Sequence, residues 1–152
     1  MLDSTLAALA RLRGQDAVAL SQGLSAENAE ACLTQSIRPL NRSSLSAACD
    51  AAGLLPDVIA IVVPAGVFTT PIEWTAIATA GGAAVHLKAP ASDPALCRAL
   101  SAAFCAEGLN VSWSTDRTLP AVDAIVAFGS DSTLDTIARA HPDTPIARFG
   151  HR

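Results

Sequence analysis

The residues Gly129, Ser130 and Asp131 stand where an apolar run ends and a helical pattern begins. The run, VDAIVAF, ends at Phe128 and has the composition of a buried strand. A glycine and a serine at such a junction can bind a phosphate, because the following helix presents unpaired N–H groups and the positive end of its dipole. Ser130 or Asp131 can equally cap the helix, and the charge of Asp131 counts against an anion. The spacing leaves a phosphate site and a plain helix cap both open.

Lys88 is the second residue that could take part in binding. It ends the otherwise apolar segment AAVHLK, where its amine could donate a hydrogen bond to a ribose or phosphate oxygen. A lysine that extends from a strand end into solvent needs no ligand to explain it, so this alternative stays open. His86 lies on the same face of that segment, where a core or interface histidine is expected. We predict no catalytic residue, because no spacing of serine, histidine and acid indicates nucleophilic catalysis.

Strands alternate with helices from Pro56 onward. The strands are predicted at residues 58–63, 83–88, 110–113, 123–128 and 145–149, and the helices between them at 72–80, 94–107 and 132–140. This alternation predicts an α/β fold with a doubly wound, mainly parallel, Rossmann-like sheet, since the strands are apolar on both faces. We divide the chain into an N-terminal helical segment, residues 1–55, and a Rossmann-like region, residues 56–152.

The N-terminal segment carries three helical patterns, the first with leucines at positions 2, 6, 9 and 12 on one stripe. Polar and glycine residues mark where helices should begin or end. The expected end residues are Asp3 or Ser4, Gly14 in the left-handed conformation, Ser25, Ser43 or Ser44, Gly53, and Asp93 before the helix at 94–107.

Ligands of a doubly wound sheet bind outside the carboxyl ends of its strands. Four segments follow strand ends and are rich in small, polar or turn-forming residues: 64–71, 88–93, 114–120 and 129–133. Neither G-x-G-x-x-G nor G-x-x-x-x-G-K-[ST] occurs in the sequence, which disfavours an ordinary Rossmann dehydrogenase or a P-loop enzyme.

The composition limits the classes of partner. Hydrophobic residues make up 51% of the 152 residues, but no apolar stretch approaches the roughly 18 residues that cross a bilayer, so no membrane partner is expected. The net charge is −4 and the basic residues are scattered, so nucleic acid is not expected to bind. The first residues carry no export signal, and we expect a cytoplasmic protein.

The cysteines are expected to be structural. Cys32, Cys49, Cys97 and Cys105 form no C-x-x-C pair and have no nearby histidine at ligand spacing, so we predict no metal site. Cys97 and Cys105 are eight residues apart in a helical pattern and should share a face. In a cytosolic chain, each cysteine is expected to be a small buried hydrophobe.

Several separated segments together resemble one family. The runs VVPAGVFTTPIEWTAIATAGGAAVHLKAPASDPAL, STDRTLPAVDAIVAFGSD and ARFGHR are similar, in order and at fitting distances, to the acyl-CoA reductases. This family comprises relatives of the fatty-acyl-CoA reductase of luminous bacteria within the aldehyde dehydrogenase superfamily. The resemblance covers about residues 55–152 and implies the first part of a nicotinamide-cofactor domain, so region 56–152 would be an incomplete nucleotide-binding region.

The resemblance implies a set of cofactor-binding residues. Lys88 matches the family's lysine at the end of the second strand and would contact the adenosine ribose. Gly129 and Ser130 match the glycine and serine after the fourth strand and would lie against the pyrophosphate. A loop of five residues would lie beside the nicotinamide half of the cofactor. These residues are Ala65, Gly66, Val67, Phe68 and Thr69.

Single positions that differ from the family affect cofactor preference and catalysis. Relatives that prefer NADH carry an acid three residues after the lysine, where this chain has Ala91, so NADPH or NADH is expected with a lean to NADPH. Relatives often carry an asparagine after the glycine of the first loop, where its amide helps to hold an oxyanion, whereas this chain has Val67, which has no amide.

The family's nucleophilic cysteine lies beyond a Gly-His-Arg motif, and this chain ends within that motif at Arg152. We therefore expect the NAD(P)H-binding portion of an acyl-CoA reductase, either a fragment or a stand-alone product. It would use acyl-CoA only if the missing cysteine region is supplied. The alternative is a non-catalytic α/β interaction or assembly module derived from the family. Half of such a fold leaves a sheet edge and apolar surface to cover, so a homo-oligomer or a partner chain is expected.

Overall fold

The computed structural model describes residues 1–21, 23–65 and 69–150. Within these ranges the chain forms seven helices and five strands. The helices are α1 (Leu2–Arg13), α2 (Ala17–Leu20), α3 (Ala26–Ile37), α4 (Arg42–Ala52), α5 (Thr70–Ala80), α6 (Ala95–Ala106) and α7 (Asp131–Ala140). The strands are β1 (Val58–Val62), β2 (Ala84–Lys88), β3 (Val111–Ser114), β4 (Ala124–Gly129) and β5 (Ile146–Gly150).

The five strands form one sheet in the order β3-β2-β1-β4-β5, and every neighbouring pair is parallel. β1 lies at the centre, where Ile59 pairs with Val85 of β2 and with Ala124 of β4. The strand order reverses direction between β1 and β4, which makes the sheet doubly wound. The predicted Rossmann-like α/β fold with preceding helices is confirmed.

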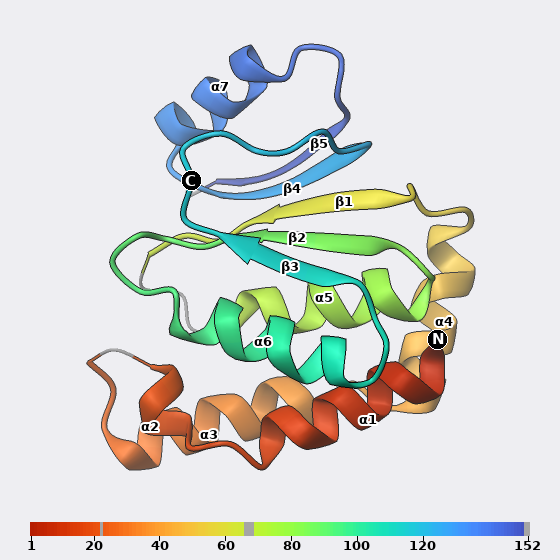
Figure 1. The fold of residues 1–152 in the computed structure, drawn as a ribbon, viewed down its shortest axis with the longest axis vertical. Coiled ribbons are helices and arrows are strands. Elements are labelled where there is room, and N and C mark those ends of the chain that lie inside the picture. The colour runs from red at the N-terminus through yellow and green to blue at the C-terminus, as the bar shows by residue number, and fades with distance from the viewer. Residues whose placement is uncertain (22, 66–68, 151–152) are drawn as a thin grey trace.

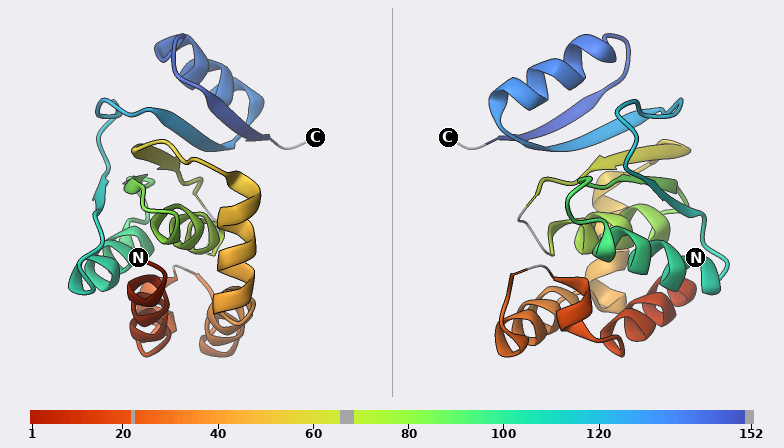
Figure 2. Two further views of the ribbon diagram at one scale, coloured as in Figure 1. Left: turned by 90° about the vertical axis from the view of Figure 1, so that its right-hand side faces the viewer. Right: turned by 60° about the vertical axis from the view of Figure 1, so that its left-hand side comes forward.

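The helices lie in layers around this sheet (Figure 1). α5 and α6 connect β1 to β2 and β2 to β3, and they cover one face. α7 connects β4 to β5 and covers the opposite face of those two strands. The N-terminal helices form a further layer beneath α5 and α6, with α4 rising along one side of the molecule (Figure 2).

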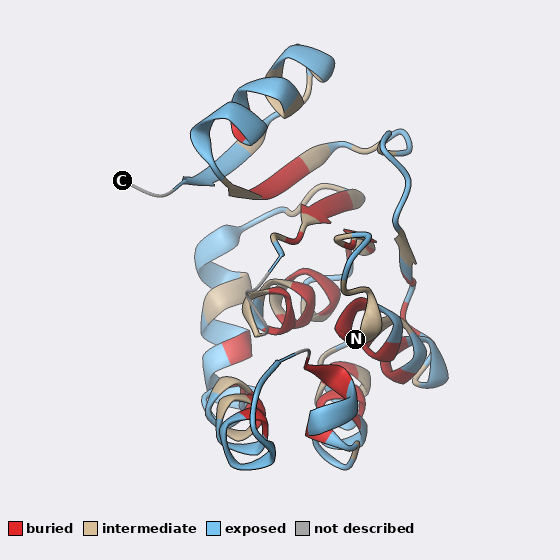
Figure 3. Ribbon diagram, turned by 90° about the vertical axis from the view of Figure 1, so that its left-hand side faces the viewer, coloured by how far each residue is buried: buried red, intermediate tan, exposed pale blue. Residues whose placement is uncertain are grey.

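Two groups of apolar side chains hold the layers together. The larger one joins Ile61 and Leu87 of the sheet to Phe104 of α6 and to Leu9 and Leu12 of α1, all of them almost fully buried. The smaller one lies under α7, around Leu134 and its neighbours in β1 and β4. Burial is concentrated in the central strands and the helices beside them, whereas the outer side of α7 is exposed (Figure 3). The leucine stripe predicted in the first helix therefore contributes to the main core.

Ser25 caps α3 as predicted, since its hydroxyl accepts a hydrogen bond from the Asn28 amide at 3.3 Å. Gly53 ends α4 with a positive φ of 68°. Several other predicted helix ends are wrong. The N-cap of α4 lies two or three residues earlier than predicted, because Asn41 and Ser44 form a reciprocal capping box.

The remaining end residues also differ from the prediction. Neither Asp3 nor Ser4 caps α1, which begins at Leu2 and places Asp3 in its first turn. Gly14 has a φ of −80° and is not left-handed. Asp93 does not cap α6, whose N-cap is Pro94. A short helix that the sequence did not predict, α2, begins where Asp16 accepts a hydrogen bond from the Val18 amide at 3.0 Å. Within the described ranges, no helix is both long and apolar enough to cross a membrane.

Candidate functional site

The carboxyl ends of β1 and β4 lie side by side, and the chain leaves them towards opposite faces of the sheet. β1 continues to α5 on one face, and β4 continues to α7 on the other. Helices that diverge in this way leave a crevice at the strand ends, and ligands of doubly wound sheets bind in such a crevice.

A cleft of about 460 Å³ opens at this end of the sheet. Its walls come from the ends of β1 and β2, the segment between β3 and β4, and the first two turns of α7. The lining residues are Val62, Val63, Lys88, Ala89, Pro90, Arg117, Ser132, Thr133, Thr136 and Ile137. The cleft thus brings together parts of three of the four strand-end segments that the sequence singled out.

Lys88 is half-buried in the wall of this cleft. It alternates along β2 with the buried Leu87, so its side chain leaves the face of the sheet opposite α5 and α6. Its amine donates a hydrogen bond to the Ala89 carbonyl at 3.1 Å. It is the only lysine in the sequence. The structure therefore places Lys88 in the cleft at the carboxyl ends of the strands, where its ammonium group has further N–H donors available for hydrogen bonds.

Ser130 caps α7 in the structure. The Thr133 amide donates to the Ser130 hydroxyl at 3.4 Å, and that hydroxyl lies 3.0 Å from the hydroxyls of both Ser132 and Thr133. Of the two alternatives that the sequence left open, the helix cap is therefore present. The cap leaves Ser130 accessible to a ligand, because this residue is exposed. The two hydroxyls that it contacts, those of Ser132 and Thr133, line the cleft.

Gly129 lets the backbone turn closely into α7. Its φ is +156°, and a Cβ added there would lie 3.4 Å from the Cβ and Cγ2 of Thr133. The conformation is one that side chains rarely adopt, so glycine keeps the end of β4 close to the first turn of α7.

The carboxylate of Asp131 lies on the far side of β4 from the cleft. A Cβ added to Gly150 of β5 would be only 2.6 Å from its Oδ1, so the carboxylate lies against the end of β5. Asp131 does not line the cleft. The negative charge of Asp131, which would oppose the binding of an anion, is therefore directed away from the cleft.

The predicted loop after β1 comprises residues 65–69. Gly66, Val67 and Phe68 lie outside the described residues. Thr69 directly precedes α5, is half-buried and does not line the cleft.

Arg117, Thr133 and Thr136 line the cleft and were not predicted as binding residues. A signal for Arg117 was present in the sequence. Apart from Lys88, it is the only cation in the four strand-end segments.

His86 bridges two serines of the neighbouring strand. Its Nδ1 lies 2.9 Å from the Ser112 hydroxyl and its Nε2 lies 3.1 Å from the Ser114 hydroxyl. Burial lowers the pKa of His86 below 6.5, nearby Lys88 lowers it further, and Asp116 opposes the shift. A neutral imidazole can donate to one serine and accept from the other, whereas the protonated ring has no acceptor left.

We expect the protein to lose stability as the pH falls from neutral to below 6.5 because of His86. The folded state lowers the pKa of this group, so the unfolded chain binds more protons below pH 6.5 and folding weakens as the pH falls. Thermal unfolding across this range would measure the loss. His86→Gln should reduce the loss. An equal loss in the wild type and His86→Gln would contradict the assignment.

The cysteines differ in exposure. Cys97 is buried, as predicted, whereas Cys32 and Cys49 are half-buried and Cys105 is exposed. The predictions that Cys105 is buried and that it shares a face with Cys97 are wrong, because Cys105 lies on the solvent side of α6 while Ala103 and Phe104 of the same turn are buried. Burial raises the pKa of Cys97 to about 12, with the negative charge of Asp93 adding to the effect and Lys88 opposing it. Cys97 is therefore a poor nucleophile at neutral pH.

Alkylation should separate the two cysteines of α6. We expect iodoacetamide at mildly alkaline pH to modify Cys105 at least roughly a hundredfold faster than Cys97, since the thiolate is the reactive form and Cys97 is enclosed. Mass spectrometry of the digested protein would measure both rates. In concentrated guanidinium chloride the rates should converge, and similar rates in the folded protein would contradict the burial of Cys97.

No group of three histidine, cysteine, aspartate or glutamate side chains in the described part of the chain could hold a metal ion.

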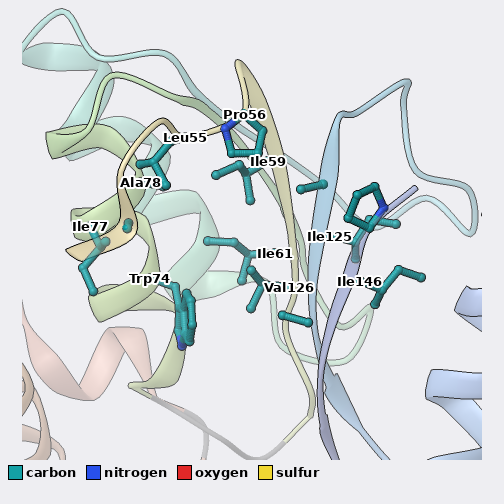
Figure 4. A pocket seen from close by; sticks show the side chains of 14 residues that line it. Leu55, Pro56, Ile59, Ile61, Trp74, Ile77, Ala78, Ile125, Val126 and Ile146 are labelled. Atoms are coloured by element: carbon teal, nitrogen blue, oxygen red, sulfur yellow. The ribbon is translucent and has the colours of Figure 1, made fainter. Parts of the chain in front are cut away.

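A second cavity, the apolar trough, lies on the α5 side of the sheet beneath β4 and β5. It has a volume of about 400 Å³, and its walls include Trp74, Ile61, Val126 and Ile146 (Figure 4). Close to it, the rings of Phe128 and Phe149 stack with their centroids 4.8 Å apart, and Trp74 lies 5.2 Å from Phe149. No described helix lies across β4 and β5 on this side, and Phe149 is 42% exposed.

The fold is that of solved aldehyde dehydrogenases. The chain superposes on indole-3-acetaldehyde dehydrogenase with a TM-score of 0.74 in the apo form and 0.73 in the complex with NAD⁺, at 17% identity and over 99% of this chain. Methylmalonate-semialdehyde dehydrogenase from Oceanimonas doudoroffii gives 0.68 at 17% identity over 99% of this chain. Glyceraldehyde-3-phosphate dehydrogenase from Methanocaldococcus jannaschii DSM 2661, complexed with NADP, gives 0.65 at 13% identity over 99% of this chain.

The match covers only part of those proteins. The chain spans 44% and 38% of the two indole-3-acetaldehyde dehydrogenase chains, 38% of the methylmalonate-semialdehyde dehydrogenase chain and 42% of the glyceraldehyde-3-phosphate dehydrogenase chain. No protein-family model and no curated protein matches the sequence. At these identities the likeness shows the fold alone.

Proposed function

We propose that this chain binds a nicotinamide dinucleotide across the carboxyl ends of β1, β2 and β4, as the cofactor-binding portion of an NAD(P)H-dependent acyl-CoA reductase. The observation that carries the proposal is that Lys88 and the first turn of α7 line one cleft at the point where the strand order reverses. Solved neighbours with the same fold are complexed with NAD⁺ or NADP. The acyl-CoA reductase assignment is supported by the sequence resemblance of residues 55–152.

The residues that line the cleft suit such a ligand. They offer one ammonium group, one guanidinium group and three hydroxyls, and no carboxylate among the described lining residues opposes an anion. Lys88 would donate to the adenosine ribose. Ser130 and the first N–H groups of α7 would hold the pyrophosphate, because the helix dipole is positive at this end. Residues 65–69, including Gly66, Val67, Phe68 and Thr69, would lie beside the nicotinamide.

Reduction of an acyl thioester to an aldehyde needs a hydride and a thiolate that accepts the acyl group. The dinucleotide, when bound, supplies the hydride. Among the cysteines of this chain, Cys97 is enclosed, and none lines the cleft. We therefore assign the chain the binding and orientation of the cofactor, and we assign the nucleophile to a further polypeptide region.

The apolar trough favours a second candidate function. An exposed aromatic side chain beside an uncovered apolar sheet face is typical of a surface that binds protein. The chain could therefore be a non-catalytic assembly module that keeps the fold and binds a partner chain or a second copy. Such a module has no need of a working cofactor site, so cofactor binding distinguishes the two functions.

Calorimetric titration of the folded protein with NADPH and with NADH tests the proposal. Saturable binding of either cofactor to one site per chain is the expected result. Absence of binding in a sample whose circular dichroism shows the native helices would reject the cofactor-binding function and leave the assembly module.

A further inference from the structure

We propose that Arg117 binds a phosphomonoester on the adenosine ribose of the ligand in the cleft, and that it thereby selects NADPH over NADH. This inference rests on the proposed function. Nothing in the sequence resemblance assigned a role to Arg117, and the inference comes from its place in the wall of the cleft.

The sheet register brings Arg117 close to Lys88. Lys88, the last residue of β2, pairs with Ser114, the last residue of β3. Arg117 follows three residues later, where the chain leaves the sheet, and it lines the same cleft as Lys88 and Pro90. The only two cations of the strand-end segments therefore meet at one site, although they are far apart in the chain.

The positive charge of Arg117 is not taken up by the protein. In the described part of the chain, Arg11, Arg42 and Arg148 form ion pairs, whereas Arg117 has neither an ion pair nor a hydrogen bond. The nearest acid in sequence, Asp116, does not line the cleft, and its charge acts on His86. Ala91, three residues after Lys88, contributes no carboxylate.

The two cations suit two different parts of one ligand. If Lys88 donates to the adenosine ribose, a second cation in a cleft of about 460 Å³ lies within reach of the ribose hydroxyls and of any phosphate on them. The guanidinium group is planar and matches two phosphate oxygens at once, whereas the free hydroxyl of NADH offers no charge. A phosphate on the ribose would therefore give Arg117 an anionic partner that NADH does not offer at that position.

Two cofactors share this chemistry. NADPH carries the phosphomonoester on the 2′ oxygen of its adenosine ribose, and coenzyme A carries one on the 3′ oxygen. Adenosine 2′,5′-bisphosphate and adenosine 3′,5′-bisphosphate represent these two sources without the rest of either cofactor. 5′-AMP, which lacks the second phosphate, is the reference ligand.

The test titrates NADPH, NADH and these three nucleotides into the wild type, Arg117→Gln and the control Arg38→Gln. Arg38 is exposed at the end of α3, on the other side of the sheet from the cleft. We expect the wild type to bind NADPH roughly ten- to a hundredfold more tightly than NADH, the range of a charge-assisted hydrogen bond to a phosphate. Arg117→Gln should remove most of that difference by weakening the binding of NADPH and leaving the binding of NADH unchanged. Arg38→Gln should preserve the difference.

The outcomes separate this inference from the proposed function. Tighter binding of the 2′,5′-bisphosphate than of the 3′,5′-bisphosphate, lost in Arg117→Gln, supports NADPH as the source; the reverse preference overturns NADPH selection and assigns the phosphate to coenzyme A. Equal binding of NADPH and NADH that Arg117→Gln leaves unchanged overturns the inference while the proposed function stands. Binding of a bisphosphate through Arg117 without binding of either dinucleotide overturns the proposed function instead.

Discussion

Lys88→Met is expected to weaken the binding of NADPH and NADH alike, by roughly ten- to a hundredfold, because it removes a charged donor from the ribose. Methionine keeps the aliphatic length of the side chain, so the half-buried stem can pack as before. The loss should therefore appear in calorimetric affinity and leave the unfolding midpoint nearly unchanged. The equal effect on both cofactors separates Lys88 from Arg117, whose substitution should affect NADPH alone.

Ser130→Ala completes this prediction at the pyrophosphate end, where it should also weaken both cofactors. The substitution removes the cap of α7, which costs about 1 kcal/mol of stability by itself. Ser25→Ala is the matched control, since Ser25 caps α3 through the same hydrogen bond at a site remote from the cleft. Equal cofactor affinity in Ser130→Ala and Ser25→Ala would show that Ser130 caps α7 and does not contribute to cofactor binding.

Phe104→Ala is expected to give the largest loss of stability, about 3–5 kcal/mol, because it leaves a cavity in the main core. Phe104 is fully buried in α6, a helix that packs against both α1 and β3. Urea unfolding followed by circular dichroism would measure the loss. Phe149→Ala is the matched control, because Phe149 is 42% exposed and its removal should cost no more than about 1.5 kcal/mol.

The same unfolding curves test how residues 1–55 and 56–152 depend on each other. Leu9 and Leu12 of the first segment share one core with Phe104 of the second. We therefore propose that the two segments unfold together, and that Phe104→Ala shifts a single transition. A separate early transition of the N-terminal helices, unaffected by this substitution, would contradict a shared core.

The order and type of the main elements were determined by the sequence. The β-branched run at 58–63 and the leucine stripe of the first helix are patterns of apolar residues. Such a pattern indicates which side chains are buried, and it can be recognised from a few neighbouring residues. Lys88 at a strand end and Ser130 at a helix start were found for the same reason, since each position depends only on its neighbours. Several helix ends were predicted wrongly. Asn41 was missed because Ser43 and Ser44 follow it closely, and all three are residue types that commonly cap helices.

The tertiary structure decided which of these positions meet. Lys88, Arg117 and Thr133 line one cleft only because β1 lies between β2 and β4 and because α7 crosses to the opposite face from α5. It also directed Asp131 towards β5, and it left the trough beside Trp74 uncovered. Strand order and the side taken by each helix follow from packing between segments far apart in the chain. The local pattern of apolar residues does not report such contacts, so the sequence singled out Lys88 as a separate position and only the fold showed that it lines one cleft with Arg117 and Thr133.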